Sequence, residues 1–322
     1  MSKKQTVAMT STGAPINKKP LSTRIKNNFG YYLMFLPVLF FVIIIYYWPM
    51  LGVRYAFYTY KLKNIEFVGL KNFYTMFAKK EFWTAFTNTL EISITKLLIT
   101  TFASVLVSVF LNEMHNLFAK KSLQTIIYLP HFMSWAVVAA IFQLFLSKSS
   151  TGFVNETLKA WGVLSESIDF LHVQSMWRPI FYLINIWKET GWGTVIFLAT
   201  LSGINPELYE AADIDGASRL QKIWYVTVPA LMNTVIIVLI LNLAKVLNLF
   251  ESVFVLYNNR VFDVSDVIST YVYRMTGKSN AEGVVPNPMI GIVMDLFNAI
   301  LAMILVLGAN TISRRVSSTS LF

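Results

Sequence analysis

The stretch "YEAADIDGASR", Tyr209 to Arg219, lies between two long apolar segments of a strongly basic chain. Its acidic residues make it too polar for a lipid interior. Asn205, just upstream, suits a helix N-cap and is followed by a proline, which favours the first helical position. Asp215-Gly216 is a turn signal, because glycine readily takes the left-handed conformation that closes a helix. The stretch therefore predicts a short helix, a turn and a second helix from about Ala217.

The first of these helices should present an acidic face. Glu207, Glu210 and Asp213 recur every three residues, and Glu207 also lies in the first turn, where a carboxylate meets the positive end of the helix dipole. Ala211 and Ala212 leave the neighbouring surface nearly flat, so that another surface can approach the backbone closely. The helix is shaped for docking; a solvated connector without a partner is the alternative interpretation.

The composition indicates a membrane protein. Of 322 residues, 55% are hydrophobic and only 14% are charged, outside the balance of soluble domains. A hydrocarbon core of about 30 Å needs about 20 apolar residues per helix. We therefore predict an all-α polytopic membrane protein with six transmembrane helices and a polar loop at 204–229. The six apolar stretches are Tyr31 to Leu51, Ile92 to Leu111, Leu123 to Leu146, Ile180 to Leu201, Val228 to Leu249 and Met289 to Ile312.

The two ends read as tails around a domain at 29–313. Residues 1–28 are rich in Ser, Thr, Lys and Pro and have little to bury, so we expect a disordered or surface-bound tail. Residues 314–322 form a second short tail. A cleaved signal peptide is the alternative for the first apolar stretch, but this stretch is long and ends in aromatic residues rather than a small-residue cleavage site. The chain has no cysteine, which excludes disulfides and thiolate chemistry.

The charges of the loops leave the orientation almost open. An even number of spans places both termini on the same side of the membrane. The Lys and Arg residues of the loops and tails divide equally between the two sides, so their number does not decide the orientation. Short loops carry more weight, and the basic pairs Lys120-Lys121 and Arg314-Arg315 lie in short segments, which favours cytoplasmic termini. The long segments at 52–91, 147–179 and 250–288 would then all lie on the opposite face.

The polar loop resembles the EAA loop of permease subunits of type I binding-protein-dependent ABC importers. Ile223 departs from this pattern, in which an aromatic residue is common, and the adjacent Trp224 could supply the contact. The resemblance implies a cytoplasmic coupling helix, seated in a groove of an ATPase subunit, and cytoplasmic termini. The residues that match, at the family's spacing, are Glu210, Ala211, Ala212, Asp215, Gly216, Ala217 and Pro229.

Further motifs are similar to those of the oligosaccharide or polysaccharide subgroup of these permeases. The subgroup implies import of a carbohydrate that an extracellular solute-binding lipoprotein delivers. It also implies a second, different permease subunit, two cytoplasmic ATPase subunits, and a bacterial cell membrane. The motifs include "NTL" at 88–90, "YLP" at 128–130, "LFESVFVLYN" at 249–258, "ISTYVYR" at 268–274 and "ANTISRRVSSTSLF" at 309–322.

Polar residues within the predicted spans indicate a hydrated path. A charged side chain at a span centre costs about 2.5 to 3.5 kcal/mol, so such residues should face protein or water. Sugar hydroxyls need amide or carboxylate partners, and the C–H faces of sugars stack on tryptophan. Pairing with partner helices, and simple packing of the tryptophans, are the alternatives. The path candidates are Trp135, Asn185, Trp187, Glu189, Trp192, Asn242, Lys245, Asn248, Asp295 and Asn298; Lys188 shares their face of the fourth span.

Other function classes have less support. The chain has no Gly-x4-Gly-Lys-Ser/Thr loop, so it should hold no cofactor of its own, with ATP and Mg²⁺ bound by the partner ATPase. Its three histidines are scattered, without a metal or hydrolase motif, which disfavours a membrane glycosyltransferase or hydrolase. A secondary, ion-coupled carbohydrate transporter is the other alternative, although no inverted repeat is evident. Glu91 and Lys96 are off a common helical face, so each should find a partner on another helix.

Overall fold

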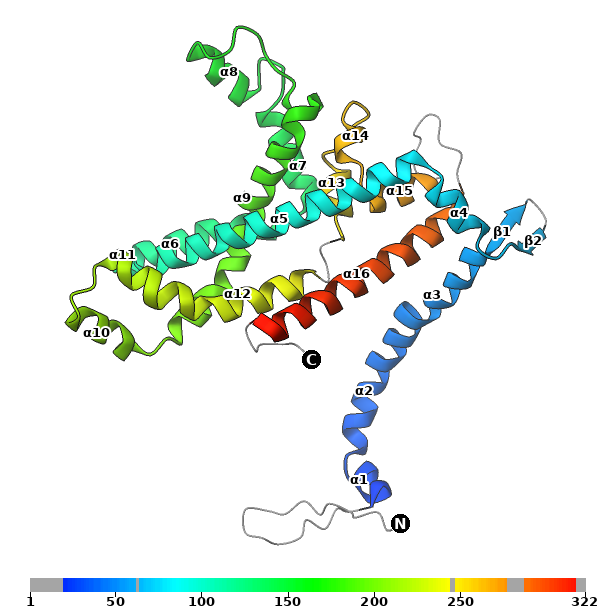
Figure 1. The fold of residues 1–322 in the computed structure, drawn as a ribbon, viewed down its shortest axis with the longest axis horizontal. Coiled ribbons are helices and arrows are strands. Elements are labelled where there is room, and N and C mark those ends of the chain that lie inside the picture. The colour runs from blue at the N-terminus through cyan, green and yellow to red at the C-terminus, as the bar shows by residue number, and fades with distance from the viewer. Residues whose placement is uncertain (1–19, 62–63, 244–246, 277–286, 317–322) are drawn as a thin grey trace. The chain divides into compact units, whose positions relative to one another are not determined.

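The computed structural model describes residues 20–61, 64–243, 247–276 and 287–316. The chain divides into two compact units, Met1–Arg54 and Tyr55–Phe322, and each is considered by itself. The described residues are predominantly helical, with one two-stranded antiparallel hairpin (Figure 1).

The first unit is an apolar helical segment. It contains α1 (Leu21–Asn27), α2 (Phe29–Val42), a π-helical turn at Ile43–Tyr47 and α3 (Trp48–Met50). In the part of the chain that the structure describes, the side chains of α2 are left uncovered, and these side chains are apolar on every face of the helix. A helix that is hydrophobic all round requires lipid or another protein around it. The helical run Phe29–Phe57 is long and apolar enough to cross a membrane, in line with the first predicted span.

The second unit opens with small elements and then a long helix. A 3₁₀ turn (Leu51–Phe57) leads from the first unit into β1 (Tyr58–Lys61), which pairs with β2 (Asn64–Phe67). Then follow α4 (Lys71–Phe77) and the long α5 (Lys80–Asn112), which contains the second predicted span. The buried Asn72 side chain donates to two backbone oxygens of the preceding segment, which holds α4 against the hairpin.

The prediction that the third span is one continuous helix is wrong. The segment forms α6 (Leu117–Tyr128), a 3₁₀ turn (Leu129–Phe132) and α7 (Trp135–Phe145), and the two helices are bent by 102°. Pro130 in the turn cannot donate a backbone hydrogen bond, and the Ser134 side chain caps a new helix by accepting from Val137 N. Apolarity alone did not reveal this break.

The fourth predicted span lies within α9 (Gln174–Ser202), which packs along α5. Before it come α8 (Phe153–Ala160) and a 3₁₀ turn (Phe170–His172). Among the described residues, four helices and the bent α6–α7 pair are apolar enough to cross a membrane, and α9 falls below that measure. The number of six spans stays a prediction.

The fifth predicted span has different ends. A continuous helix begins at α11 (Arg219–Lys222), passes through a π-helical turn (Ile223–Thr227) and continues as α12 (Val228–Leu243). Pro229 therefore lies inside a helix instead of beginning one; the wider turn before it accommodates a residue without an N–H. The predicted end at Leu249 is wrong, since residues 247–249 are not helical.

The C-terminal part returns to α5 and α9 before the last span. It comprises α13 (Phe250–Phe254), α14 (Phe262–Ser265), α15 (Ile268–Met275) and α16 (Pro288–Val316), which contains the sixth predicted span. Buried apolar side chains of α7, α9, α13 and the α14 region form one core, and those of α4, α5, α15 and α16 form another. Together they fix α5 and α9 as the central pair of helices of this unit.

Candidate functional site

The polar loop folds into a short helix with defined ends. In α10 (Pro206–Ile214) the Asn205 side chain accepts from Glu207 N at 3.1 Å, as an N-cap does. At the other end Gly216 has a φ of +73°, and Gly216 N donates to Asp213 O at 3.1 Å. Ala217 N also donates to Ala212 O at 2.9 Å, which completes a Schellman motif. These predicted caps are confirmed.

Two side-chain contacts fasten α10 to the helix that follows. The Tyr209 hydroxyl lies 3.0 Å from Thr227 Oγ1, and Lys222 Nζ donates to Asp213 Oδ1 at 2.6 Å. The second helix begins at Arg219, slightly later than expected, with a capping box between Ser218 and its N3 residue. These two contacts join α10 to the start of the α11–α12 helix.

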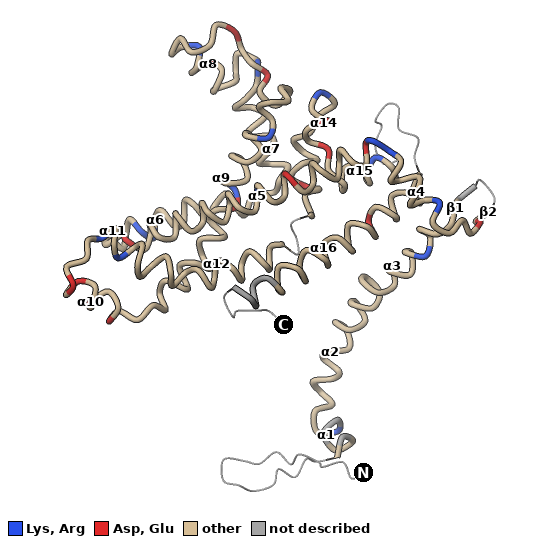
Figure 2. The backbone as a smooth tube through the Cα atoms, viewed as in Figure 1, with Lys and Arg blue, Asp and Glu red and all other residues tan. Residues whose placement is uncertain are grey.

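The surface of this loop is both acidic and apolar. Glu210 and Ala211 are exposed, and Figure 2 shows acidic residues gathered at α10 while α12 carries few charges. The apolar part, which the acidic pattern did not predict, comprises Ile214, which is 87% exposed, together with Leu220, Trp224 and Tyr225. Large apolar side chains that are this exposed suit contact with lipid or with another protein.

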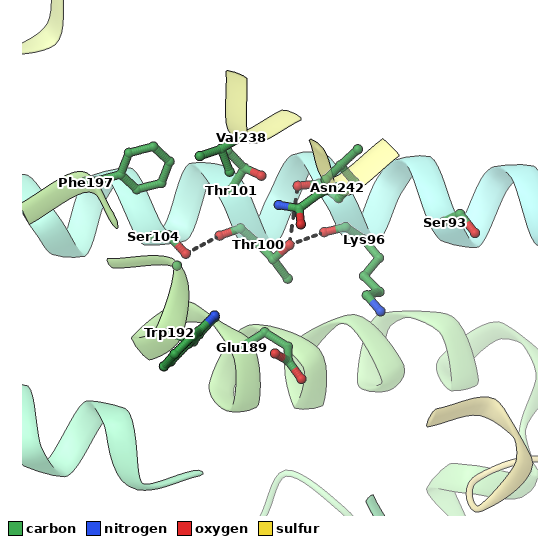
Figure 3. A pocket seen from close by; sticks show the side chains of 12 residues that line it. Ser93, Lys96, Thr100, Thr101, Ser104, Glu189, Trp192, Phe197, Val238 and Asn242 are labelled. Atoms are coloured by element: carbon green, nitrogen blue, oxygen red, sulfur yellow. Dashed lines mark hydrogen bonds between the residues drawn. The ribbon is translucent and has the colours of Figure 1, made fainter. Parts of the chain in front are cut away.

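A cavity of about 200 Å³ lies between α5, α9 and α12 (Figure 3). Most of its polar wall comes from α5, on which hydroxyl side chains recur at helical spacing. The Ser104 hydroxyl donates to Thr100 O at 2.8 Å and approaches Thr190 O at 3.1 Å. The lining residues are Ser93, Lys96, Leu97, Thr100, Thr101, Ser104, Glu189, Trp192, Gly193, Phe197, Val238 and Asn242.

A cluster of charged and aromatic groups continues the α9 wall of the cavity. His131 Nδ1 lies 3.1 Å from Glu189 Oε2, and the His131 ring stacks on Trp192 with centroids 4.9 Å apart. Lys188 is buried, donates to His131 O at 2.9 Å, and lies 3.7 Å from Glu189. Its ammonium is also 5.3 Å from the Trp135 ring centre, within range of a cation–π contact.

The structure brings together three of the predicted path residues, Glu189, Trp192 and Asn242, in the cavity lining. Trp135 contacts Lys188 behind it, and Trp187 packs against the Phe142 ring. Asn185 is buried and donates to a backbone oxygen of its own helix. Asn248, Asp295 and Asn298 are outside the lining, and Lys245 lies outside the described residues.

Sequence reasoning missed the α5 wall and His131. Ser93, Thr100 and Ser104 are spaced by seven and four residues and therefore share one face of the helix, as the polar residues of α9 do. This spacing could have predicted a polar face on α5. Glu91, in contrast, was correctly expected to pair between helices, because it forms an ion pair with Arg178 of α9. Arg178 also donates to Asn88 Oδ1 and to Val264 O, which joins α5, α9 and the α14 region.

The fold and these features define a class: a helical, multi-pass membrane permease with a polar cavity and a capped polar loop. The family described as "Binding-protein-dependent transport system inner membrane component" matches residues 104–318. Protein LplB of Bacillus subtilis is 35% identical over 303 residues, covering 92% of each chain. The permease of a bacterial ABC transporter importing alginate is 37% identical, with a TM-score of 0.83 over 93% of this chain and 100% of that one.

The chain belongs to the family of binding-protein-dependent transport system inner membrane components. A further relative, 34% identical over 90% of this chain and 89% of its own, is the polygalacturonan/rhamnogalacturonan transport system permease YteP of Bacillus subtilis. The chain is therefore a permease subunit of an ABC importer, a transport component and not an enzyme.

Proposed function

We propose that the chain is the transmembrane permease subunit of an ATP-driven importer that moves an oligosaccharide delivered by an extracellular binding protein. The observation that carries this proposal is the α10 knob, which comprises α10 (Pro206–Ile214) and its closing turn at 215–217. The knob is capped at both ends and fastened to the start of the α11–α12 helix. The relatives support the substrate class, since YteP is named for pectic polysaccharides and a similar structure contains a periplasmic protein with a bound alginate pentasaccharide.

The α10 knob is the contact with the ATPase in this proposal. Its apolar residues would enter a groove of the ATPase, and its acidic edge would face basic residues there. Closure of the ATPase subunits would move α10 as a rigid body, and the Tyr209 and Lys222 contacts would pass that movement to α12. The residues assigned to coupling are Glu210, Ala211, Ala212, Asp215, Gly216, Ala217 and Pro229.

The cavity between α5, α9 and α12 is part of the sugar path. It joins hydroxyl and amide groups to the indole of Trp192, the combination that a polyhydroxylated ring with apolar C–H faces requires. The predicted residues outside the cavity would continue the path toward a second permease subunit; they are Trp135, Asn185, Trp187, Lys245, Asn248, Asp295 and Asn298.

The complete importer would contain this chain, a second and different permease, two ATPase subunits that bind ATP and Mg²⁺, and an extracellular binding lipoprotein. The chain would cross the bacterial cell membrane with both termini in the cytoplasm. The α10 knob would then lie on the cytoplasmic side, and α8 on the outside with the binding protein. Uptake driven by an ion gradient without ATP would instead indicate a secondary transporter.

The test is charge reversal and helix disruption on the knob in the assembled importer. Glu210→Lys, and Gly216→Pro at a φ that proline cannot adopt, should lower import and sugar-stimulated ATP hydrolysis together. A loss of about tenfold corresponds to roughly 1.4 kcal/mol at the contact. Glu81→Lys, a reversal at an exposed position outside both the knob and α8, is the control and should change neither rate. Wild-type rates in both knob variants would refute the coupling role.

A further inference from the structure

Lys96 places its amino group in the cavity lining without a direct partner among the described residues. Its side chain extends from α5 toward α9, where it faces Glu189 (Figure 3). No hydrogen bond or ion pair joins its Nζ to another residue in the part of the chain that the structure describes, and Glu189 lies across the cavity from it. A cation that lines a cavity without a direct partner requires an anion or water.

Glu189 already has other partners. One of its carboxylate oxygens lies 3.1 Å from His131 Nδ1, and the other lies 3.7 Å from the Lys188 ammonium. Two lysine side chains, Lys96 in the cavity lining and Lys188 behind it, thus lie near the single carboxylate of Glu189. The charge balance at this wall is positive, which favours an anionic ligand.

Resting on the proposed function, we infer that the cavity recognises a carboxylate-bearing sugar, an oligosaccharide of uronic acids, and that Lys96 binds its carboxylate. The sugar ring would stack on Trp192, whose orientation is fixed by the parallel His131 ring. Hydroxyls of the sugar would exchange hydrogen bonds with Thr100, Thr101 and Asn242. A neutral sugar would fill the same space but leave the Lys96 ammonium without its counter-charge.

The test compares matched substrates in the complete importer, reconstituted in proteoliposomes with its binding protein. Each uronate trisaccharide is paired with the same trisaccharide after reduction of its carboxyl groups to primary alcohols. Because wild type and variant share one binding protein, any change in the acid-to-neutral uptake ratio between them belongs to the permease. Lys96→Met should lower this ratio at least about tenfold, as loss of a charge-assisted contact does. Lys96→Arg should retain most of it.

Lys80→Met, the same substitution at an exposed position on α5, is the control and should leave the ratio unchanged. An unchanged acid-to-neutral uptake ratio in Lys96→Met would overturn the inference while leaving the importer itself intact. Failure of the wild-type complex to import either member of any pair, or any other saccharide, would refute the proposed function instead.

Discussion

At the residue scale, buried polar groups connect the distant parts of the second unit. Asp266 and Arg274 are each 7% exposed and form a two-pronged ion pair, and Thr270 donates to Asp266 Oδ1 at 2.7 Å. Burial raises the pKa of Asp266, while the Arg274 guanidinium opposes that rise. Asn88 of α5 donates to the Asp266 backbone oxygen at 3.0 Å. These contacts explain the "NTL" and "ISTYVYR" motifs as a fastening between α5 and α15.

Removal of one member of this pair should destabilise the protein strongly. Asp266→Asn leaves the Arg274 charge buried without its counter-charge, which costs about 3–5 kcal/mol. Thermal unfolding of the purified importer should show a clearly lower Tm. The double variant Asp266→Leu, Arg274→Met removes both charges and should recover much of this loss. Equal Tm values for the single and double variants would contradict the assigned role.

The sequence indicated only part of the cavity at this scale. Glu189 and Trp192 stood out because a charge and an indole are unusual in an apolar helix. Hydroxyl residues such as Thr100 are ordinary in such helices, where they donate to their own backbone, as Thr100 does to Lys96 O. Only the packing of α5 on α9 and α12 distinguishes the hydroxyls that face a cavity from those that face lipid.

At the element scale, the chain's helices were predictable and their breaks were not. Apolar length located α5, α9 and α16, because a stretch of about 20 apolar residues has few alternatives to a helix in lipid. The turn at Pro130 and the continuous helix through Pro229 show that a proline can end one helix and be accommodated in another. The deciding factors, the Ser134 cap and the π-helical turn, are local geometry that composition does not reveal.

The contact between α6 and α9 depends on a glycine. A Cβ at Gly191 would lie 2.2 Å from Ile127 O, a backbone atom that cannot move without shifting α6. Gly191→Ala should therefore destabilise the protein by about 1–3 kcal/mol, as overpacking does, and displace His131 relative to Trp192. Thermal unfolding and sugar uptake measure the two effects. Gly308→Ala in α16, where a Cβ meets nothing within 4 Å, is the control and should unfold like wild type.

At the scale of the whole molecule, the chain exposes surfaces that suit contact with lipid or with other proteins. The α2 side chains are exposed and apolar, the α10 knob exposes Ile214, and the cavity draws on three helices. The EAA-like spacing predicted the knob because caps and turns are encoded locally. The sequence indicates the orientation in the membrane less clearly than it indicates the knob, since the basic loop residues divide equally between the two sides of the membrane.

The most direct test of the account is a cross-link from the knob in the assembled importer. The chain has no cysteine, so Ala211→Cys provides a single exposed attachment point on α10. With a short thiol-to-amine reagent, this variant should yield an adduct with the ATPase subunit. The matched variant Glu166→Cys should instead be labelled from outside intact cells by a membrane-impermeant maleimide. Absence of the ATPase adduct from Ala211→Cys, or labelling of that variant from outside the cell, would contradict the account.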